Sequence, residues 1–448
     1  MVTSPRSIDA VFGLESRIEG ILAFEAALAR ASAREGVIAA AVADVIVSQC
    51  NVSGFDLASI AREAEVAGNE AIPTIDQLRA RVAAVDESAA NWVHWGATSQ
   101  DAIDTALVLQ LGDALAAIDV ELARVIASLA SLAELHAATP MVGRTLLQEA
   151  APTTFGFKVA GWLDALLRHR ARLTVVRDEA SVVQLGGAVG NLSAFGSNGR
   201  RISAAVAAEL RLGLPDLAWH THRDRLANVA TNVAATVATF GKMAHDIALL
   251  TQSEIAEVRE PAGAGRGRSS TMPQKRNPIG CATILAAAVR TPGLAATMLS
   301  SMAQEHERGL GGWQAEWTVL PELILVAHGA FVHAAFIVDG LEVDANRMAR
   351  NIVATNGRIF AEAVSFALRA RVGRARASEI IGRALGRVNK ETTLRAALDS
   401  DAAMAAVFSG DEIDALFDVS RHLGLAEETA RRVAVAARQS VASVATPR

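Results

Sequence analysis

The sequence predicts an all-α protein with a bundle of long helices at its centre. Alanine-rich segments whose apolar residues recur every three or four positions dominate the 448-residue chain, whereas alternating apolar and polar runs are few and tyrosine is absent. Hydrophobic residues make up 51% of the chain and charged residues 20%, a composition that can bury extensive apolar surface. A chain this long exceeds one ordinary core, so we expect two or three domains.

The longest regular pattern covers residues 221–260. Its core-facing positions lie three or four apart, at Leu226, Val229, Val233, Val237, Phe240, Ala244, Ile247 and Thr251. A helix of about 39 residues at ~1.5 Å per residue would span ~58 Å, a length seen in rods rather than in compact globules. Such a helix needs partner helices along its whole length, so the pattern predicts a bundle.

The other helices are predicted from the same periodicity and from the residues that interrupt it. We expect helices over residues 12–35, 102–136, 154–179, 278–307 with a bend at Pro292, and 317–338, and shorter ones before residue 90 and after residue 340. We expect turns or irregular structure at residues 140–143, 185–199, Gly373 and Ser409-Gly410. Asp339-Gly340 is interpreted as a domain boundary.

The charge and the cysteine content narrow the class of partner and the compartment. A formal net charge of −5 provides no broad basic surface for nucleic acid or for an anionic membrane, so a local basic site favours a small ligand. Cys50 and Cys281 make no disulfide framework and indicate a reducing, cytoplasmic setting. Residues 1–9 show no signal-peptide pattern, and the most membrane-like run, 323–338, is short for a bilayer and is interpreted as a buried bundle helix.

Residues 261–280 form the most distinctive polar stretch. Glycines at positions 263, 265 and 267 precede a run of basic and hydroxyl side chains without an acidic residue, which predicts a mobile loop. Asn277 suits a helix N-cap and Pro278 the first helical position, so the loop leads into a helix N-terminus. Basic side chains beside such a terminus predict an anion site, and the alternative is a solvated surface loop.

Four further segments carry polar side chains between the helical patterns, at residues 94–101, 143–148, 219–225 and 304–317. Thr98 and Ser99 would offer hydroxyls and amides to a carboxylate at a helix start, or serve only as a plain N-cap. His220 and His222 lie two apart, a spacing that does not align them for a metal, so they are either solvated or substrate contacts. Trp313 and Trp317, four apart on a helix, are typical of a core position.

The string Ser-Ser-Thr-Met-Pro-Gln-Lys-Arg-Asn-Pro at residues 269–278 resembles the signature loop of the fumarase/aspartase superfamily, whose enzymes make or break a bond β to a carboxylate. His-x-Gly-x-Thr-Ser-x-Asp at residues 94–101 is similar to the first motif of that superfamily. The resemblance implies a three-domain, all-α fold with domains over residues 1–101, 102–340 and 341–448. It also implies a homotetramer with active sites shared between subunits, which would gather polar segments that are spread along long rods.

Leu146 narrows the resemblance to one branch. The stretch of adenylosuccinate and argininosuccinate lyases that matches residues 143–148 reads Thr-His-x-Gln, and its histidine takes part in acid/base chemistry, whereas this chain has Leu146 there. The amino-acid sequences of residues 219–224 and 304–317 are also similar to those of the carboxymuconate cycloisomerase family. Membership would imply an isomerase that needs no cofactor and converts a small tricarboxylate, 3-carboxy-cis,cis-muconate, into 4-carboxymuconolactone in aromatic catabolism.

The resemblance also assigns roles to residues. Ser269 would handle the proton, and Lys275 would hold the carboxylate at which charge develops. Arg268 and the helix N-terminus after Asn277 would add positive potential. The other residues implied to contact substrate are His94, Thr98, Ser99, Arg144, Thr145, Gln148, His222, Arg223, Ser270, Met272, Asn277 and Arg308. The resemblance implies no metal.

Two other functions stay open at this point. One is a C–N lyase like adenylosuccinate lyase, against which Leu146 speaks. The other is a non-catalytic helical scaffold, as lens crystallins are within the superfamily, and the intact serine loop speaks against it.

Overall fold

The computed structural model describes residues 7–263 and 265–442. Within them, regular structure is helical apart from two small two-stranded sheets, which confirms the all-α prediction. The chain divides into two compact units: unit 1 is residues 1–120, 169–238 and 287–330, and unit 2 is residues 121–168, 239–286 and 331–448. The three-domain division stays a prediction. Residues 1–6 of the stretch without a signal-peptide pattern, and the outer limits of the first and third predicted domains, lie outside the described residues.

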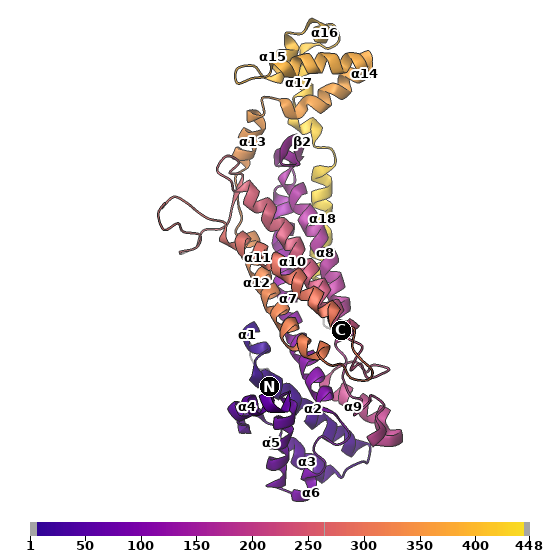
Figure 1. The fold of residues 1–448 in the computed structure, drawn as a ribbon. Coiled ribbons are helices and arrows are strands. Elements are labelled where there is room, and N and C mark those ends of the chain that lie inside the picture. Colours follow the sequence, from indigo (N-terminus) through magenta and orange to yellow (C-terminus); the bar gives the residue numbers. More distant parts are fainter. Residues whose placement is uncertain (1–6, 264, 443–448) are drawn as a thin grey trace. The chain divides into compact units, whose positions relative to one another are not determined.

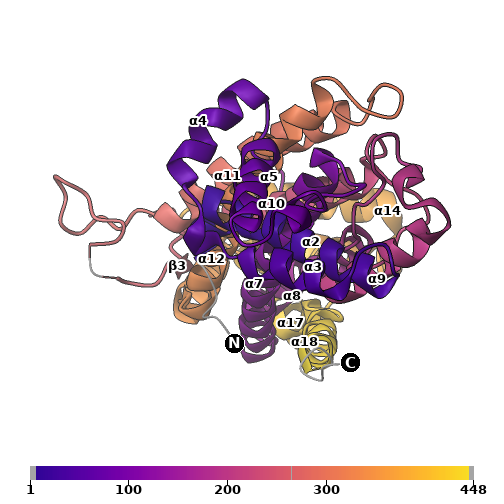
Figure 2. The same cartoon turned by 90° about the horizontal axis from the view of Figure 1, so that it is seen from below.

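Unit 1 contains the N-terminal helices, and all of them except the first share one hydrophobic core. They are α1 (Ile8–Val11), α2 (Leu14–Arg34), α3 (Ala40–Gln49), α4 (Leu57–Ala67), α5 (Ala71–Ala83), α6 (Glu87–Ala90) and α9 (Gly199–Leu210), with 3-10 turns at Val52–Gly54 and Ser193–Asn198. Helix α2 follows the helix predicted over residues 12–35 and contacts α3, α4, α5 and α9 (Figures 1 and 2). Ile18, Ile21 and Phe24 are buried on its inner face, at the helical spacing of the sequence pattern.

Five long helices confirm the predicted central bundle elements. They are α7 (Ser99–Leu135), α8 (Phe155–Ala180), α10 (Asp224–Leu250), α11 (Ile279–Ser300) and α12 (Gly312–Asp339). Each begins in one unit and ends in the other. Pro292 lies inside α11, at the position where a bend was expected.

The helix predicted over residues 221–260 is shorter than its pattern. Helix α10 has 27 residues, about 40 Å at ~1.5 Å per residue. Past Leu250 the polar residues 252–254 form turns, and Ala256 takes a left-handed conformation with φ of 50°. The chain then runs into strand β3 (Val258–Arg259), which pairs with β4 (Glu342–Val343). Periodicity therefore placed the helix correctly but extended it at both ends.

The turn predicted at residues 140–143 is wrong, because this segment is a strand. Strand β1 (Pro140–Thr145) pairs antiparallel with β2 (Gln148–Thr154), with a bulge between Val142 and Arg144. The two-residue loop that joins them consists of Leu146 and Leu147, with φ of 49° and 63°. Such a loop normally contains glycine or asparagine, so this hairpin holds two leucines in an unfavourable backbone region.

The C-terminal part of unit 2 is a set of shorter helices, as expected. They are α13 (Ala345–Ala354), α14 (Ala361–Arg387), α15 (Leu394–Asp399), α16 (Ala402–Ala405), α17 (Gly410–Leu416) and α18 (Ala426–Ala442), with 3-10 turns at Arg358–Phe360 and Val419–His422. Gly373 breaks the helical backbone inside α14 with φ of 78°. Ser409 forms a capping box with Glu412 at the start of α17.

Three of the long helices, α10, α11 and α12, are long and apolar enough to cross a membrane by length and composition alone. The structure buries 56%, 33% and 50% of their most apolar windows, respectively. Helix α11 therefore leaves the largest share of its apolar window uncovered within one chain. The interpretation of residues 323–338, within α12, as part of a buried bundle helix rather than a membrane span stays a prediction.

Candidate active site

Asp101 organises the first polar segment, at the N-terminus of α7. Its Oδ1 atom accepts hydrogen bonds from His220 Nε2 at 2.7 Å and from the Gly186 amide at 3.0 Å. Its Oδ2 atom accepts from the Gly187 amide at 2.9 Å and from the Thr98 amide at 3.1 Å. The last contact is half of a capping box at the start of α7. One buried carboxylate thus ties together three segments that are far apart in the sequence.

Close backbone packing explains the glycine in this segment. Gly96 has φ of 76°, and a Cβ atom on it would lie 2.5 Å from the Phe195 ring. A Cβ atom on Gly187 would lie 2.7 Å from the Gly96 carbonyl oxygen. Beside this contact, Thr98 and Ser99 are half-buried, and their hydroxyls have no partner among the described residues. The predicted contact of these two hydroxyls with a ligand stays a prediction.

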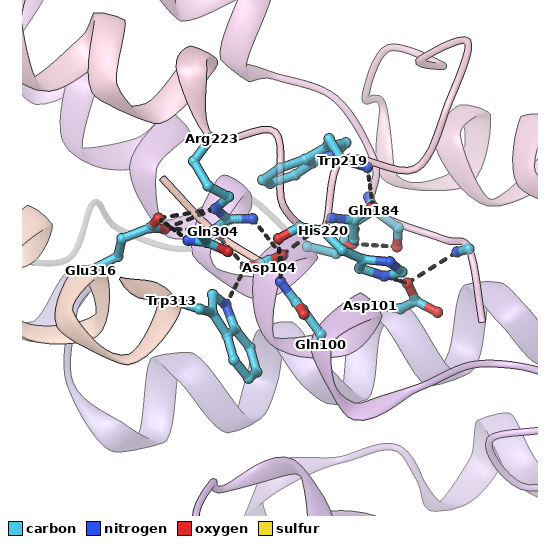
Figure 3. A network of polar contacts seen from close by, with 12 residues as sticks. Gln100, Asp101, Asp104, Gln184, Trp219, His220, Arg223, Gln304, Trp313 and Glu316 are labelled. Carbon is cyan, nitrogen blue, oxygen red and sulfur yellow. Dashed lines mark hydrogen bonds and ion pairs between the residues drawn. The ribbon is translucent and has the colours of Figure 1, made fainter. Parts of the chain in front are cut away.

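Arg223 lies at the centre of a buried ion network (Figure 3). Its side chain is 1% exposed and donates to Asp104 at 2.7 and 3.0 Å and to Glu316 at 2.6 to 3.1 Å. The guanidinium also stacks over Trp219, 4.7 Å from the ring centroid. The donors of Arg223 are taken by two buried carboxylates, so Arg223 joins elements of unit 1 within one chain. Its contact with substrate stays a prediction.

Asp104 is the most heavily hydrogen-bonded member of the network. Besides Arg223, it accepts from Trp313 Nε1 at 3.0 Å, from Gln100 Nε2 at 3.1 Å and from Gln184 Nε2 at 3.2 Å (Figure 3). Burial raises the pKa of Glu316, although Arg223 opposes this effect. Arg223 supplies one positive charge for two carboxylates, so the network has one negative charge in excess. Glu316 is the carboxyl group whose pKa is raised in this environment.

The sequence reasoning missed most of this network. Gln100, Asp101 and Asp104 lie on one stretch of a helix that is otherwise apolar, and this was a usable signal for buried polar contacts. Gln184 gives no such signal. His220 was considered only as a solvated side chain or a substrate contact, whereas it is 3% exposed and bound to Asp101.

Three more predicted residues lie in unit 1. His94 Nδ1 contacts Glu25 Oε1 at 2.5 Å; burial lowers the pKa of His94, but Glu25 outweighs this and the pKa is raised. Arg308 donates to Gln100 Oε1 at 3.1 Å and to the carbonyls of Gly187 and Ala188 at 3.0 and 2.9 Å. His222 is exposed. Contacts of these residues with substrate stay predictions.

In unit 2, the hairpin presents the second predicted segment. Arg144 donates to both oxygens of Glu257 at 2.9 Å, and Asn351 Nδ2 donates to the same carboxylate at 2.7 Å. Thr145 and Gln148 flank the turn and are exposed. Leu146, at the tip, is 97% exposed. The structure therefore presents an apolar side chain where related lyases carry histidine.

The signature loop extends from the rest of unit 2 (Figures 1 and 2). Its neck is closed by the Asn277 amide, which donates to the Gly267 carbonyl at 2.9 Å, and by a bridge between Arg268 and Arg276. Arg276 also pairs with Glu342 at 2.8 Å, which fixes the neck to β4. The segment is thus held at its base.

Ser269 has a distinct environment within this loop. Its Oγ atom accepts hydrogen bonds from the amides of Thr271 at 3.2 Å and Met272 at 3.0 Å. Ser270, one residue on, contacts only the Thr271 hydroxyl at 3.4 Å among the interactions of the described residues. Two amides therefore point at the oxygen of the predicted proton-handling serine.

The predicted helix-terminus anion site is wrong in this structure. Helix α11 begins at Ile279, and Glu260 occupies its N-terminus by accepting from the Gly280 amide at 3.0 Å and the Cys281 amide at 2.7 Å. Asn277 is therefore not the N-cap, and Pro278 is not the first helical residue. A protein carboxylate already satisfies the free amides that were expected to attract substrate.

A cleft of about 640 Å³ runs beside the neck of the loop. Met272, Lys275 and Asn277 line it together with Arg266 and Arg276, whereas Ser269 and Ser270 do not. The cleft is strongly basic, although Glu260 also lines it.

Arg266 anchors this side of the loop. Its guanidinium lies 3.8 Å from the ring centroid of Phe336 and donates to His333 Nδ1 at 2.8 Å. Burial and the charge of Arg266 lower the pKa of His333, which keeps the imidazole able to accept this bond.

Unit 1 thus brings together three of the five polar segments, residues 94–101, 219–225 and 304–317, and unit 2 holds the hairpin and the signature loop. No group of three or more His, Cys, Asp or Glu side chains among the described residues has the geometry of a metal site.

The class of protein follows from comparison with known families. A family described as "Lyase" matches residues 7–293, and one described as "Adenylosuccinate lyase C-terminus" matches residues 357–433. The chain therefore belongs to the lyase family of the fumarase/aspartase superfamily.

Within that family, the chain groups with the 3-carboxy-cis,cis-muconate cycloisomerases. It is 48% identical to the enzyme of that name from Pseudomonas aeruginosa over 424 residues, which cover 94% of this chain and 92% of the relative. It is 46% identical to the Bradyrhizobium diazoefficiens cycloisomerase over 413 residues, 92% of each chain. The crystal structure of the 3-carboxy-cis,cis-muconate lactonizing enzyme from Pseudomonas putida matches with a TM-score of 0.91 and 43% identity, covering 97% of each chain.

Proposed function

We propose that the protein is an isomerase that closes 3-carboxy-cis,cis-muconate to 4-carboxymuconolactone without a cofactor. The observation that carries this proposal is the likeness to cycloisomerases over more than nine-tenths of the chain. The hairpin agrees with it, because its tip carries the exposed Leu146 in place of the histidine of related C–N lyases. The product would enter the protocatechuate branch of the β-ketoadipate pathway.

The reaction needs one proton and the stabilisation of one developing anion. A carboxylate oxygen of the substrate forms a C–O bond to one carbon of a conjugated double bond. The π electrons move to the neighbouring carbon, where the adjacent carboxylate accepts them as an enolate-like charge. A proton delivered to that carbon completes the lactone, so no atom or electron pair has to come from a cofactor.

Ser269 is proposed to handle this proton. A serine hydroxyl is too weak an acid or base unless its alkoxide is stabilised. The amides of Thr271 and Met272, which point at Ser269 Oγ, supply part of that stabilisation. Lys275 is exposed on the same loop and is proposed to hold the carboxylate at which charge develops. Closure of the loop would exclude water and strengthen both effects.

The remaining predicted residues are proposed to bind the other substrate carboxylates. Thr98 and Ser99 offer unpartnered hydroxyls at the start of α7, within the described part of unit 1. Arg308 lies beside them through its bond to Gln100. A small tricarboxylate would meet these groups together with Lys275 and Asn277 once the polar segments are assembled.

We also propose that the assembly is a cytoplasmic homotetramer with active sites shared between subunits. Two observations support it. Helix α11 leaves two-thirds of its apolar window uncovered in one chain, and Val289 on it is 81% exposed. The predicted substrate-binding segments are divided between two compact units. Packing of the same helices from other subunits would cover the apolar surface.

A spectrophotometric assay tests the activity. We expect loss of the ultraviolet absorbance of 3-carboxy-cis,cis-muconate without added metal or nucleotide, and no turnover of adenylosuccinate or argininosuccinate. The second candidate, a C–N lyase, is favoured only by the match of residues 357–433 to the adenylosuccinate lyase C-terminus. Turnover of adenylosuccinate with none of carboxymuconate would establish that candidate and overturn the proposal.

A further inference from the structure

A second basic cavity lies in unit 2 and is lined by residues of β1 and of helices α8, α10 and α18. Its volume is about 700 Å³, within the range of small-molecule sites. Its walls carry four cationic side chains and two carboxylates, namely Arg144, Lys158, Lys242, Arg432, Asp164 and Asp246.

Lysine is rare in this chain, which makes its placement informative. Only four of the 43 basic residues are lysines, at positions 158, 242, 275 and 390, and the first two line this one cavity. Elsewhere arginine serves at nearly every basic position. A compact ammonium differs from a planar guanidinium in that it acts as a point charge inside a confined space.

The carboxylates of the cavity are already engaged. Asp164 pairs with Arg168, and Asp246 pairs with Lys242 and accepts from Trp162 Nε1 at 2.7 Å. Arg144 is held by Glu257, outside the cavity lining.

Two cations of the cavity make no direct ion pair with a described residue. Neither Lys158 nor Arg432 has an ion pair or a hydrogen bond from its side chain to any described residue. Lys158 is half-buried, and its surroundings disfavour its charge. Burial lowers the pKa of Lys158, and Lys242 and Arg144 add to this effect, whereas Asp246 and Glu257 oppose it. A charge held in this way gains most from an anion that enters the cavity.

We propose that this cavity binds a small polyvalent anion, with Lys158 and Arg432 as its principal contacts. Phe157 and Val433 line the same cavity and offer apolar contact to a carbon skeleton, which favours a di- or tricarboxylate over inorganic phosphate. Lys158 and Arg432 have no proposed role in the isomerisation, whereas Arg144 and Thr145, which line the same cavity, are predicted substrate contacts. The proposed anion site therefore adjoins the hairpin segment of the predicted substrate site and adds two contacts that the reaction does not use.

The scarcity of lysine provides a direct test on the intact protein. Reductive methylation with ¹³C-formaldehyde keeps each lysine charged and gives one NMR signal for each of the four lysines, plus the terminal amine. Single Lys→Arg variants assign the signals. We expect Lys158 to titrate at lower pH than the exposed Lys390, and we expect citrate to move its titration to higher pH. Inorganic phosphate, in a parallel titration, distinguishes the two anion chemistries.

Lys275 and Lys390 serve as internal controls in the same spectra. Lys275 reports on the signature loop, and Lys390 reports on non-specific binding to an exposed charge. Movement of Lys158 with citrate or phosphate, at concentrations that leave Lys390 unchanged, supports the proposal. It is overturned if citrate moves only Lys275, or if Lys158 titrates like Lys390 and responds to neither anion.

Calorimetry of unmethylated variants gives an independent measurement. Lys158→Met and Arg432→Met should each weaken citrate binding by about tenfold or more, the loss expected for a charge-assisted hydrogen bond. Lys390→Met removes the same charge at an exposed position of unit 2 and should leave binding unchanged. Equal affinity in wild type, Lys158→Met and Arg432→Met would refute the assignment.

Discussion

Replacement of Arg223 by methionine tests the structural role of this residue in the buried ion network. The substitution removes the one cation that lies between Asp104 and Glu316 and leaves two carboxylates that are both 0% exposed. Breaking a buried ion pair from one side costs about 3–5 kcal/mol, because the remaining charge is uncompensated. Two acids lose their partner here, so we expect the upper end of that range. Uptake of a proton by Glu316 limits the loss.

Two matched variants separate the contributions of the acids. Glu316→Gln removes the surplus negative charge and keeps the shape of the side chain, so we expect a cost of about 1 kcal/mol or less. Asp104→Asn should cost more. Asp104 accepts from Arg223, Trp313, Gln100 and Gln184, and an amide nitrogen cannot accept. Each donor left unpaired in the core costs about 1–3 kcal/mol.

The pH dependence adds a signed test for Glu316. Because the pKa of Glu316 is raised, the folded protein holds a proton that the unfolded chain has released, so this group stabilises the fold less as pH rises. Glu316→Gln resembles the protonated form. Its free energy of unfolding relative to wild type should therefore improve from pH 5 to pH 8.

Urea denaturation, followed by tryptophan fluorescence at one fixed protein concentration, measures all three variants. We expect the loss of stability to rise from Glu316→Gln through Asp104→Asn to Arg223→Met. An Arg223→Met variant as stable as wild type would refute the reasoning. So would a Glu316→Gln variant that loses as much as Arg223→Met.

Two other predictions concern the reaction, and a third concerns the pH dependence of the free energy of unfolding. Ser269→Ala should lower kcat by at least ~100-fold with little change in substrate affinity, and Ser270→Ala should be milder; steady-state kinetics measures both, and the reverse order would contradict the choice of serine. Thr98→Ala and Ser269→Ala, each inactive alone, should regain partial activity when mixed and reassembled; no recovery despite proven subunit exchange would contradict shared sites. Since Glu25 raises the pKa of His94 against the opposing effect of burial, His94 stabilises the fold below about pH 6.5 and loses this effect as pH rises through its folded pKa. His94→Gln should therefore be more destabilising at pH 6 than at pH 8 in urea denaturation, and an equal loss at both would refute this.

The long helices could be predicted from sequence because burial along them follows the helical period. Ile18, Ile21 and Phe24 are buried at the spacing that defined the first helix. The ends were harder to predict, since they depend on single backbone conformations. Helix α10 stops before a left-handed Ala256, and nothing in the alternation of side chains marks that residue. The hairpin was missed because Leu146 and Leu147 are not turn residues by composition.

Residues of the candidate site could be predicted only where they belong to a short sequence motif. The motifs identified Thr98, Ser99 and Ser269, whose roles stay predictions, and the structure adds the two amides that donate to Ser269 Oγ. The resemblance implied that Arg223 contacts substrate, and nothing in its own sequence segment indicated that its side chain is buried. The burial of Arg223 depends on its ion pairs with Asp104 and Glu316, which lie on two other helices. The spacing of residues in the sequence does not indicate contacts between such distant positions.

The correction at α11 changes where the stabilisation of the Ser269 oxygen has to come from. Glu260 holds the Gly280 and Cys281 amides, so the helix N-terminus is neutralised locally and cannot act on the loop as a free positive end. The amides of Thr271 and Met272 remain, and they move with Ser269 because they belong to the same turn. In the proposed mechanism, the loop therefore carries the donors that stabilise the Ser269 alkoxide, and a change in the position of the loop would move the serine and these donors together.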